Sequence, residues 1–401
     1  MASEWNNWSG SVRCRPTRVE KPGGEGDLAA VVRRAAAEGR VVRPVGAGHS
    51  SSRLVETDDV LVSLERFRGV EPHGGLEATV GAGTTIEDMN KGLLAAGLAM
   101  HNLGDVDMQH AAGATATGTH GTGRDQPILA AAVVGVRMVT AAGEVATFSE
   151  DQHPDVIRAA RVSLGALGVL TALRLRLVPA FDLRRREWCS HVDDCLAHLD
   201  ELVARHRNFD FYWYPRRDEV RMRTWNPPGE GPDDLPFARC IEDTTGPSGE
   251  LLPGHSGITR KFEETEYSVP AEAGPACFRA VRDRVRERHR KWVCWRTLYR
   301  TVAADDAYLS HAHGRPTVTI SLHQNASLPY REYFADLEPI LRAHGGRPHW
   351  GKKFNLTGAE LRPLYPMWDR FQDVRRRLDP GGRFLSPYLR SLFEPDGGGS
   401  R

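Results

Sequence analysis

The chain has 401 residues, enough for two domains with substantial cores. Its formal net charge of +1 and its 26% of charged residues give no excess of basic groups, which argues against nucleic-acid binding. No apolar run is long enough to span a membrane, the N-terminus lacks a secretory signal, and the six cysteines are scattered without a CxxC pair. We therefore expect a cytoplasmic protein with neither a membrane partner nor a bound metal.

A first group of predicted elements extends to about residue 180. An amphipathic helix is expected at 27–39, because Leu28, Val31 and Val32 recur at helical spacing. Strands are expected around Val41 and Val42 and at 60–64, 78–83 and 133–140, with a second helix at 86–96. This alternation of short strands and helices is typical of an α+β or α/β domain that binds a cofactor.

The composition changes after Pro179. Residues 226–253 are rich in Pro, Gly and Asp, which predicts a long loop. Strand-like runs return at 294–302 and 317–323, a helical run follows at 330–343, and the tail Gly397–Gly399 is expected to be disordered. This half is predicted to form a second domain, an antiparallel sheet with helices to one side.

Three glycine-punctuated segments lie in the first half, at 43–50, 112–123 and 163–169. In the first of them Gly46 and Gly48 leave backbone N–H groups bare, and consecutive bare amides can cradle a phosphate. The second consists almost entirely of small residues that cannot fill a core, which favours backbone pressed against a flat or polyanionic ligand. Neither a P-loop nor a GxGxxG fingerprint is present in the first loop, so a large dinucleotide is indicated but a nicotinamide-binding Rossmann domain is not.

Several motifs follow one another in a characteristic order. The chain carries Trp8-Ser9-Gly10, Arg43-Pro44-Val45-Gly46-Ala47-Gly48-His49-Ser50, Asn102-Leu103-Gly104-Asp105, Gly118-Thr119-His120-Gly121-Thr122-Gly123, Ser163-Leu164-Gly165-Ala166-Leu167-Gly168, Arg300-Thr301-Val302-Ala303-Ala304-Asp305-Asp306, Arg347-Pro348-His349-Trp350-Gly351-Lys352 and Leu378-Asp379-Pro380-Gly381-Gly382-Arg383-Phe384-Leu385. In this order they resemble the FAD-dependent aldonolactone and alditol oxidases, which include gulonolactone and arabinonolactone oxidases, of the vanillyl-alcohol-oxidase superfamily. The resemblance runs nearly from end to end.

The resemblance implies an α+β fold with a split PCMH-type FAD-binding domain and a substrate domain. The first comprises residues 1–180 and is completed by about 350–401; the second comprises 181–349 and has an antiparallel sheet flanked by helices. FAD is the implied cofactor, bonded covalently through His49 to the 8α carbon of the isoalloxazine, and a histidine that only hydrogen-bonds the glycine turn is the alternative. The other implied cofactor contacts are Arg43, Pro44, Val45, Gly46, Ala47, Gly48, Ser50, Gly104, Asp105, Gly113, Thr115, Thr117, Gly118, His120, Gly121, Gly168, Val169 and Lys352.

The resemblance also implies which residues carry the chemistry. Oxidation of an alcohol carbon needs fixed cations where negative charge develops, and the matching motifs place Arg300 and Lys352 there. A small residue at Gly104 is associated with access of O2 to the flavin, and Asp105 is available to hydrogen-bond a substrate hydroxyl. A simple Gly-Asp turn is the alternative for this pair.

Two positions depart from the pattern of polyol and lactone oxidases. Leu298 stands where the related Glu-x-Arg motif has a carboxylate, and Ser321-Leu322-His323 stands where alditol oxidases have His-x-Thr. Leu298, Tyr299 and Ser321 are therefore the predicted substrate contacts, and Asp105, Tyr299 and His323 are alternative readers of hydroxyl groups. His323 is also a candidate base, with a structural role as the equal alternative.

The leading hypothesis is an FAD oxidase that acts on the CH–OH group of a sugar lactone, polyol or related alcohol and reduces O2 to hydrogen peroxide. The carboxylate lost at Leu298 favours an alternative, the same chemistry on a specialised metabolite such as an amino sugar or a cyclic alcohol. A flavin- or sugar-binding protein without turnover is the non-enzymatic alternative. The expected partners are a small alcohol and O2, and the sequence does not indicate an oligomeric state.

Overall fold

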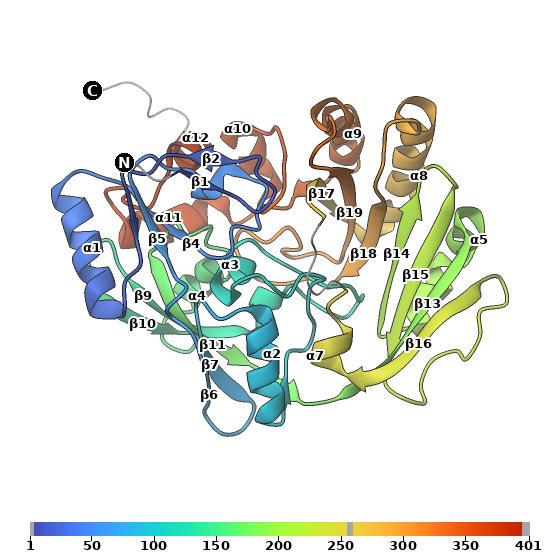
Figure 1. The fold of residues 1–401 in the computed structure, drawn as a ribbon, viewed down its shortest axis with the longest axis horizontal. Coiled ribbons are helices and arrows are strands. Elements are labelled where there is room, and N and C mark those ends of the chain that lie inside the picture. Colours follow the sequence, from blue (N-terminus) through green and yellow to red (C-terminus); the bar gives the residue numbers. More distant parts are fainter. Residues whose placement is uncertain (1–3, 255–259, 395–401) are drawn as a thin grey trace.

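The first half of the chain folds into two sheets with helices packed on them (Figure 1). The computed structural model describes residues 4–254 and 260–394. A parallel sheet has the strand order β3 (Arg18–Glu20), β5 (Val60–Ser63), β4 (Val42–Val45). An antiparallel sheet has the order β10 (Val145–Ser149), β9 (Val133–Val139), β11 (Val169–Arg176), β7 (Glu77–Gly81), β6 (Val70–Pro72). Short pairs are formed by β1 (Trp5–Asn6) with β2 (Arg13–Cys14) and by β8 (Leu98–Ala99) with β12 (Val178–Pro179).

The two helices predicted in this half lie close to their expected positions, and two further helices are not predicted. The predicted helices are α1 (Glu25–Ala37) and α2 (Ile86–Ala95), and the further ones are α3 (Ala111–Ala116) and α4 (Pro154–Arg161). Helix α1 buries Leu28, Val31 and Val32, the face that the spacing predicts, but it begins two residues earlier than expected. Glu25 lies in its first turn, where a negative charge is favoured by the helix dipole.

The second half of the chain builds one large antiparallel sheet. Its order is β16 (Arg239–Pro247), β13 (Asp182–His191), β15 (Glu219–Asn226), β14 (Asn208–Tyr214), β18 (Thr297–Val302), β19 (Thr317–Asn325), β17 (Phe262–Pro270), β20 (Arg347–Pro348). Figure 1 shows α5 (Val192–Ala197), α8 (Gly274–Arg284) and α9 (Arg331–Ala343) along its outer side, and α6 (Leu199–Arg205) packs on β14. The α+β class and the antiparallel sheet flanked by helices are confirmed.

The long loop predicted at 226–253 is wrong in part. Strand β16 and helix α7 (Ser248–Leu251) lie within it. Strand β16 is an edge strand that pairs with β13 alone, and most of its side chains are exposed. An exposed edge strand carries no alternating apolar pattern, so composition alone identified this segment as a loop.

The C-terminal segment returns to the N-terminal half. Its helices α10 (Gly358–Leu361), α11 (Trp368–Leu378) and α12 (Pro387–Phe393) lie beside β1, β2 and β4 in Figure 1. The N–H of Val42 donates to the carbonyl of Arg383 over 2.9 Å, and Arg43 donates to the carbonyl of Phe384. The tail Gly397–Gly399 lies outside the described residues.

Short 3₁₀ turns occupy Arg53–Val55, Leu129–Ala132, Ala271–Ala273 and Arg362–Leu364, and a π-helical turn occupies Val285–His289.

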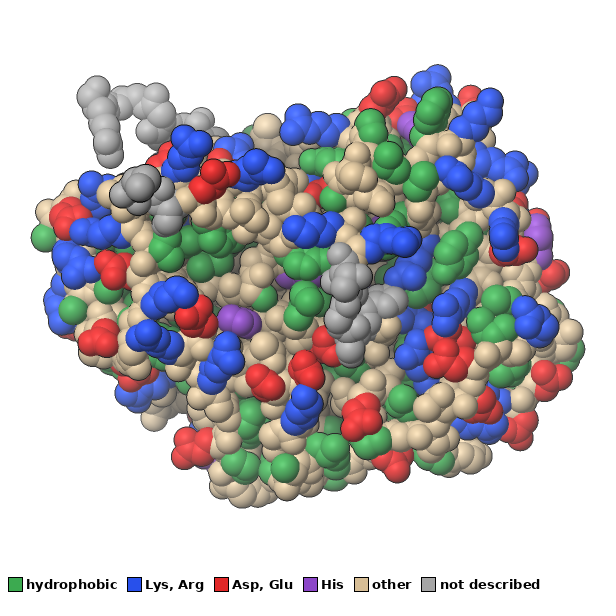
Figure 2. Space-filling view, viewed as in Figure 1, with side chains coloured by type: hydrophobic (Ala, Val, Ile, Leu, Met, Phe, Trp, Pro, Cys, Tyr) green, Lys and Arg blue, Asp and Glu red, His purple; other side chains and the backbone are tan. Residues whose placement is uncertain are grey.

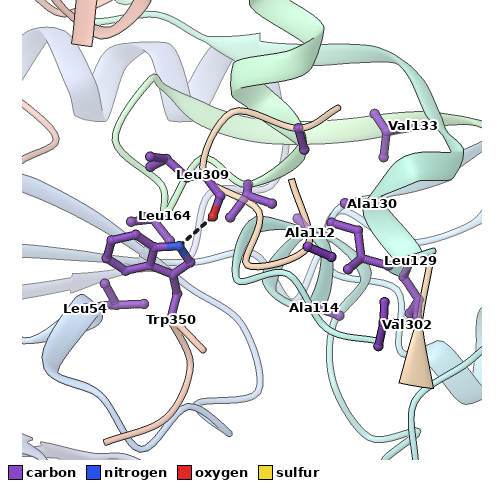
Figure 3. Close-up of a cluster of buried hydrophobic side chains, with 14 of the residues drawn as sticks. Leu54, Ala112, Ala114, Leu129, Ala130, Val133, Leu164, Val302, Leu309 and Trp350 are labelled. Atoms are coloured by element: carbon purple, nitrogen blue, oxygen red, sulfur yellow. Dashed lines mark hydrogen bonds between the residues drawn. The ribbon is translucent and has the colours of Figure 1, made fainter. Parts of the chain in front are cut away.

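Trp350 anchors the segment that follows the large sheet (Figure 3). Its side chain is fully buried near Leu54 and Leu164, and its indole N–H donates to the carbonyl of Leu309 over 2.7 Å. The hydroxyl of Ser52 donates to the Trp350 carbonyl, also over 2.7 Å. The backbone two residues before Lys352 is thereby fixed to both halves of the molecule.

The surface shows mixed charge. Basic and acidic side chains are interspersed over the face shown in Figure 2, in keeping with the net charge of +1. Among the helices of the described residues, none has the length and apolar character that a membrane crossing requires.

Candidate active site

The turn after β4 borders a large cavity in the first half of the chain. Gly48 has φ of +67°, and a Cβ at this position would lie 3.2 Å from the ring of Trp5. A Cβ at Gly46 would lie 3.0 Å from the Cβ of His110. Both positions therefore favour glycine for conformation or space. The space inside the cavity, including the solvent at its mouth, is about 870 Å³.

Most of the predicted cofactor contacts line this cavity. Sequence analysis misses Gln109 and His110, which line it too. Both immediately precede the small-residue segment, and this adjacency was the signal available in the sequence. The predicted residues that line the cavity are Arg43, Pro44, Val45, Gly46, Ala47, Gly48, His49, Ser50, Gly113, Thr117 and Gly168.

Arg43 reaches the cavity wall, but its guanidinium is committed to the backbone. The residue is 1% exposed and donates to the carbonyls of Leu164 at 2.7 Å, Gly165 at 2.8 Å and Phe384. Leu164 and Gly165 have φ of +55° and +65°, so Arg43 holds a left-handed stretch in place. Burial lowers the pKa of Arg43 to about 9. Its role in this structure is to support the wall.

Four of the predicted cofactor contacts line neither this cavity nor the next: Thr115, Gly118, Gly121 and Val169. A Cβ at Gly121 would lie 2.2 Å from the carbonyl oxygen of Leu103. The carbonyl of Gly118 accepts a hydrogen bond from His311 Nε2 at 3.0 Å, and Val169 is fully buried in β11. At these positions the small or apolar side chain serves close packing, and the structure does not support direct contact with a ligand.

His49 lies where the cavity meets a second one. Its Nδ1 is buried and has no hydrogen-bond partner among the described residues. Burial and the charge of Lys352 lower the pKa of His49 to about 4, so the imidazole is neutral at pH 7. A neutral ring nitrogen without a partner, at the edge of a glycine-lined cavity, fits the attachment of a flavin cofactor.

The second cavity is built on one face of the large sheet. Because side chains alternate along a strand, the register places Tyr212, Leu298, Ser321 and Glu266 in one row across β14, β18, β19 and β17. The neighbouring rows contribute Arg300 on one side, and His323 with Glu264 on the other. Other segments complete the lining with Ser50, Gly104, Asp105, Val106, Gln109, Thr117, Thr119, His120, Phe262, Trp295, Arg296, His349, Gly351 and Lys352.

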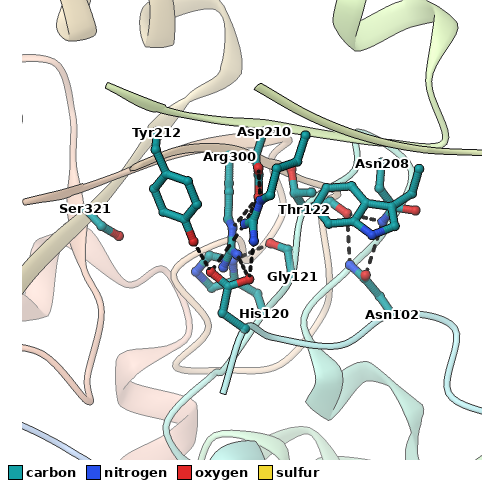
Figure 4. Close-up of polar contacts among 12 residues, drawn as sticks. Asn102, His120, Gly121, Thr122, Asn208, Asp210, Tyr212, Arg300 and Ser321 are labelled. Atoms are coloured by element: carbon teal, nitrogen blue, oxygen red, sulfur yellow. Dashed lines mark hydrogen bonds and ion pairs between the residues drawn. The ribbon is translucent and has the colours of Figure 1, made fainter. Parts of the chain in front are cut away.

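Arg300 is held between two carboxylates (Figure 4). Its Nη2 lies 2.6 Å from Asp105 Oδ1, and its Nε lies 3.1 Å from Asp210 Oδ2. Burial disfavours the charge, but Asp105 and Asp210 outweigh it and raise the pKa of Arg300. Asp105 also accepts from the Tyr212 hydroxyl at 2.5 Å and lies 3.1 Å from Arg223 Nη1. In this structure Asp105 therefore orients Arg300, in addition to lining the cavity.

Lys352 and His323 meet at one carboxylate. Lys352 Nζ contacts Glu264 Oε2, and His323 Nε2 lies 3.2 Å from Glu264 Oε1. The other ring nitrogen of His323 donates to the carbonyl of Arg296 at 3.0 Å. Lys352 and His323 lower the pKa of Glu264 against the opposing effect of burial. The ring of His323 is thus fixed, and Nε2 is its only position for a second proton.

Three buried histidines, His120, His311 and His349, place ring nitrogens within 4.8 Å of one another. Both nitrogens of His120 are engaged, with Gly121 O at 2.8 Å and Glu266 Oε1 at 2.6 Å. Those of His311 are engaged as well. Binding an ion here would break these hydrogen bonds, so the donor set favours a polar network over a metal site.

Two predicted substrate contacts take other positions than expected. Tyr299 lies on the opposite face of β18, stacked on Phe211 with ring centroids 4.9 Å apart in the core, and its predicted substrate contact is wrong. The register explains this, because neighbours along a strand point to opposite faces. The hydroxyl of Ser321 donates to Glu266 Oε2, so Ser321 acts through that carboxylate. Leu298 lines the second cavity, and its contact with the substrate stays a prediction.

Sequence analysis does not show which way Glu264 and Glu266 face. The structure points both into the second cavity, since they pair with His323 and Ser321 on β19. No sequence signal distinguishes this face of β17, because Glu263 and Tyr267 on the other face are buried as well.

Comparisons with known proteins cover nearly the whole chain. A family model described as D-arabinono-1,4-lactone oxidase matches residues 173–240 and 255–392, and a model described as FAD binding domain matches 16–149. The chain is 36% identical to an L-gulono-1,4-lactone dehydrogenase of Mycobacterium tuberculosis, over 98% of this chain and 100% of that protein. It is 31% identical to an alditol oxidase of Streptomyces sp., over 98% and 100%.

Among solved structures, cholesterol oxidase from Brevibacterium sterolicum has a similar fold. The TM-score is 0.86 at 17% identity, covering 98% of this chain and 97% of that one. The two family models match the halves of the chain that carry the two cavities. The chain therefore belongs to the D-arabinono-1,4-lactone oxidase family and is an FAD-dependent oxidase that acts on CH–OH groups.

Proposed function

We propose that this enzyme oxidises the CH–OH carbon of a sugar lactone, a polyol or a related alcohol, with FAD attached through His49 and O2 reduced to hydrogen peroxide. The observation that carries the proposal is the position of His49 at the junction of the two cavities, with a neutral, unpartnered Nδ1 among the described residues. The names of the relatives, a gulonolactone dehydrogenase and an alditol oxidase, support the substrate class.

The residues around the second cavity suit this reaction. When bound, FAD supplies the hydride acceptor, its N5 atom. Arg300 and Lys352 both line the cavity, and carboxylates hold each of them in place. Their positive charge stabilises an alcohol oxygen as its proton leaves. Arg300 is oriented by Asp105 and Asp210 before substrate arrives, so little reorganisation is needed during the reaction.

The hydroxyl proton has a destination in the same cavity. We assign it to the pair of His323 and Glu264, where His323 Nε2 faces Glu264 Oε1 at 3.2 Å. Because the Nδ1 of His323 donates to the carbonyl of Arg296, Nε2 is the ring position that accepts the proton, next to Glu264 Oε1. This pair is the proposed base.

Gly104 supports O2 as the acceptor, although it also has a packing role. A Cβ at this position would lie 3.0 Å from Thr119 Cγ2 and 3.2 Å from the carbonyl oxygen of His120. Larger side chains are therefore disfavoured at position 104 whatever the electron acceptor is. Peroxide formation is tested by a direct assay of the purified enzyme in air, with an alcohol that the enzyme oxidises.

A specialised alcohol is the second candidate substrate, and Leu298 favours it. The side chain of Leu298 lines the cavity where the related Glu-x-Arg motif has a carboxylate. A cyclic alcohol suits this wall better than an amino sugar, because the side chain of Leu298 offers no hydrogen-bond acceptor to an ammonium group. Release of peroxide with xylitol, gulonolactone or arabinonolactone would favour the first candidate.

Two broader expectations belong to the same proposal. A cytoplasmic location is supported by the six cysteines, all of which are free thiols. The division into residues 1–180 with about 350–401 and residues 181–349 is supported by the large sheet, whose strands run from Asp182 to Pro348.

Flavin attachment is tested by acid precipitation of the purified protein. We expect the yellow flavin to remain with the wild-type polypeptide and to be released from the variant His49→Ala. His110→Ala is the matched control, because His110 lines the same cavity and also has a buried Nδ1 without a partner among the described residues. That variant keeps its covalent flavin. Release from the wild type, or retention by His49→Ala, contradicts the attachment.

A further inference from the structure

Leu298 brings an apolar side chain to the second cavity, between the positions of Arg296 and Arg300. Leu298 and Arg300 are two residues apart on β18 and therefore share the face that lines the second cavity. Leu298 is 4% exposed, and its cross-strand neighbours are Tyr212 on β14 and Ser321 on β19. A substrate carbon next to the hydroxyl group held by Arg300 contacts the row formed by Tyr212, Leu298 and Ser321.

The two hydroxyl groups on the cross-strand neighbours of Leu298 are already engaged. The Tyr212 hydroxyl donates to Asp105 Oδ2 at 2.5 Å, and the Ser321 hydroxyl donates to Glu266. Figure 4 shows the ring of Tyr212 extending from its strand toward Arg300. Neither hydroxyl proton is available to a substrate oxygen at Leu298 unless one of these bonds is broken.

Two aromatic rings also line the second cavity. Trp295 and Phe262 line the same cavity, with their ring centroids 5.7 Å apart. Trp292, three residues before Trp295, is 72% exposed and takes no part. Of the carboxylates that line the cavity, Glu264 and Glu266 come from β17, two strands away from Leu298, and Asp105 is engaged with Arg300 and Tyr212. Leu298 thus brings an apolar surface to the cavity beside Arg300.

We infer that the substrate is an amphipathic alcohol, whose hydroxyl-bearing end lies at Arg300 and Lys352 and whose neighbouring carbons, lacking hydroxyl groups, pack against Leu298. The inference rests on the proposed function and narrows its substrate class. A hydroxyl buried against an apolar wall without a partner loses about 10- to 100-fold in binding. A fully hydroxylated polyol therefore binds less well than an alcohol of equal length with an apolar end.

The test uses two six-carbon probes that share a terminal vicinal diol, 1,2-hexanediol and D-sorbitol. Their kcat/KM values are measured with the holoenzyme, and their Kd values by calorimetry on dithionite-reduced enzyme, which cannot oxidise them. For the wild type we expect 1,2-hexanediol to be favoured by at least about tenfold in both quantities. The variant Leu298→Gln shifts the ratio toward sorbitol by about tenfold or more.

Leu94→Gln is the matched control, because Leu94 is 42% exposed on α2 and lines neither cavity. It leaves the ratio unchanged. A wild-type enzyme that binds sorbitol as tightly as 1,2-hexanediol overturns the inference, whether or not the variant folds. A reduced enzyme that prefers 1,2-hexanediol, in a protein whose flavin no alcohol reduces, supports the pocket assignment and overturns the proposed function instead.

Discussion

Arg300 shows how one side chain is prepared for catalysis by its surroundings. Its guanidinium is buried, and Asp105 and Asp210 hold it from two directions while Arg223 shares both carboxylates. A guanidinium can hold two carboxylates in a planar arrangement that a lysine ammonium cannot reproduce. The charge and the direction of Arg300 are both fixed before the substrate binds.

Substitution of Arg300 by lysine tests this preparation. We expect Arg300→Lys to lower kcat by about 100-fold, because the ammonium loses the fixed geometry although the charge is kept. The flavin content stays unchanged, since Arg300 does not line the cavity around Gly46 and Gly48. Single-turnover flavin reduction under anaerobic conditions measures the effect.

The control for this variant is Arg376→Lys, on the exposed face of α11, where Arg376 pairs with Asp373 at 2.8 Å. It leaves the rate of flavin reduction unchanged. An Arg300→Lys enzyme with wild-type kcat argues that only the sign of the charge matters at this position.

At the scale of the element, the small-residue segment at 112–123 serves two purposes. Its first part lies in helix α3, where Gly113 lines the cavity and a Cβ would meet no atom of the described residues within 4 Å. Its second part passes close to other backbone, so that a Cβ at Gly121 would lie 2.2 Å from the Leu103 carbonyl. The sequence pattern does not separate space kept for a ligand from space removed by packing.

Alanine substitutions at the two glycines separate these purposes. We expect Gly121→Ala to destabilise the fold by about 2–3 kcal/mol, because backbone has to move to admit the methyl group. Gly113→Ala keeps or raises stability, since alanine is the better helix former, but it fills part of the cavity and lowers FAD retention. Thermal unfolding and the ratio of flavin to protein measure the two effects. A Gly121→Ala variant that keeps its stability but loses FAD, or a Gly113→Ala variant that loses stability but keeps FAD, contradicts this division of the segment.

For the whole molecule, the C-terminal segment and the first half depend on each other. Arg43 connects β4 to the carbonyl of Phe384, and the Val42 N–H donates to the carbonyl of Arg383. Ser52 connects the Trp350 carbonyl to the first half, and the indole of Trp350 connects the same segment to Leu309 in the second half. The two cavities share His49 and Ser50 at this junction, so their geometry depends on contacts between distant parts of the chain.

Buried histidines make the stability of the molecule depend on pH. Burial is the main cause that lowers the pKa values of His101, His206 and His349 to about 4. Their unfolded values are near 6.5, so the unfolded chain binds more protons between pH 6.5 and 4, and stability falls as the pH falls through this range. Each contributes up to about 1.4 kcal/mol per pH unit. Asp305 opposes them, because burial raises its pKa to about 6.

We therefore expect the unfolding temperature to fall steadily from pH 7 to pH 5, as measured by calorimetry. The variant Asp305→Asn provides the internal check. Because it removes the opposing contribution of Asp305, the unfolding temperature falls more steeply with decreasing pH. An unfolding temperature that is constant over this range contradicts the neutral state of the buried histidines.

Local sequence determined much of the fold. The strands at 42–45, 60–63 and 133–139 and the helices at 25–37, 86–95 and 331–343 follow from the period of their apolar residues, with errors of a few residues at the ends. The exposed strand β16 could not be predicted in this way, because its pairing partner, and not its own pattern, makes it a strand.

The sequence by itself also determined the chemistry of the site, because glycine turns, a histidine and two matching cations are local features that remain recognisable in a linear chain. Only the tertiary structure decided which of these groups meet. Strand register turned Tyr299 into the core and Glu264 and Glu266 toward the cavity. The contacts of Arg300 with Asp105 and Asp210 join residues 90 or more positions apart, and no local pattern specifies such pairs, since they arise only when the sheet is assembled.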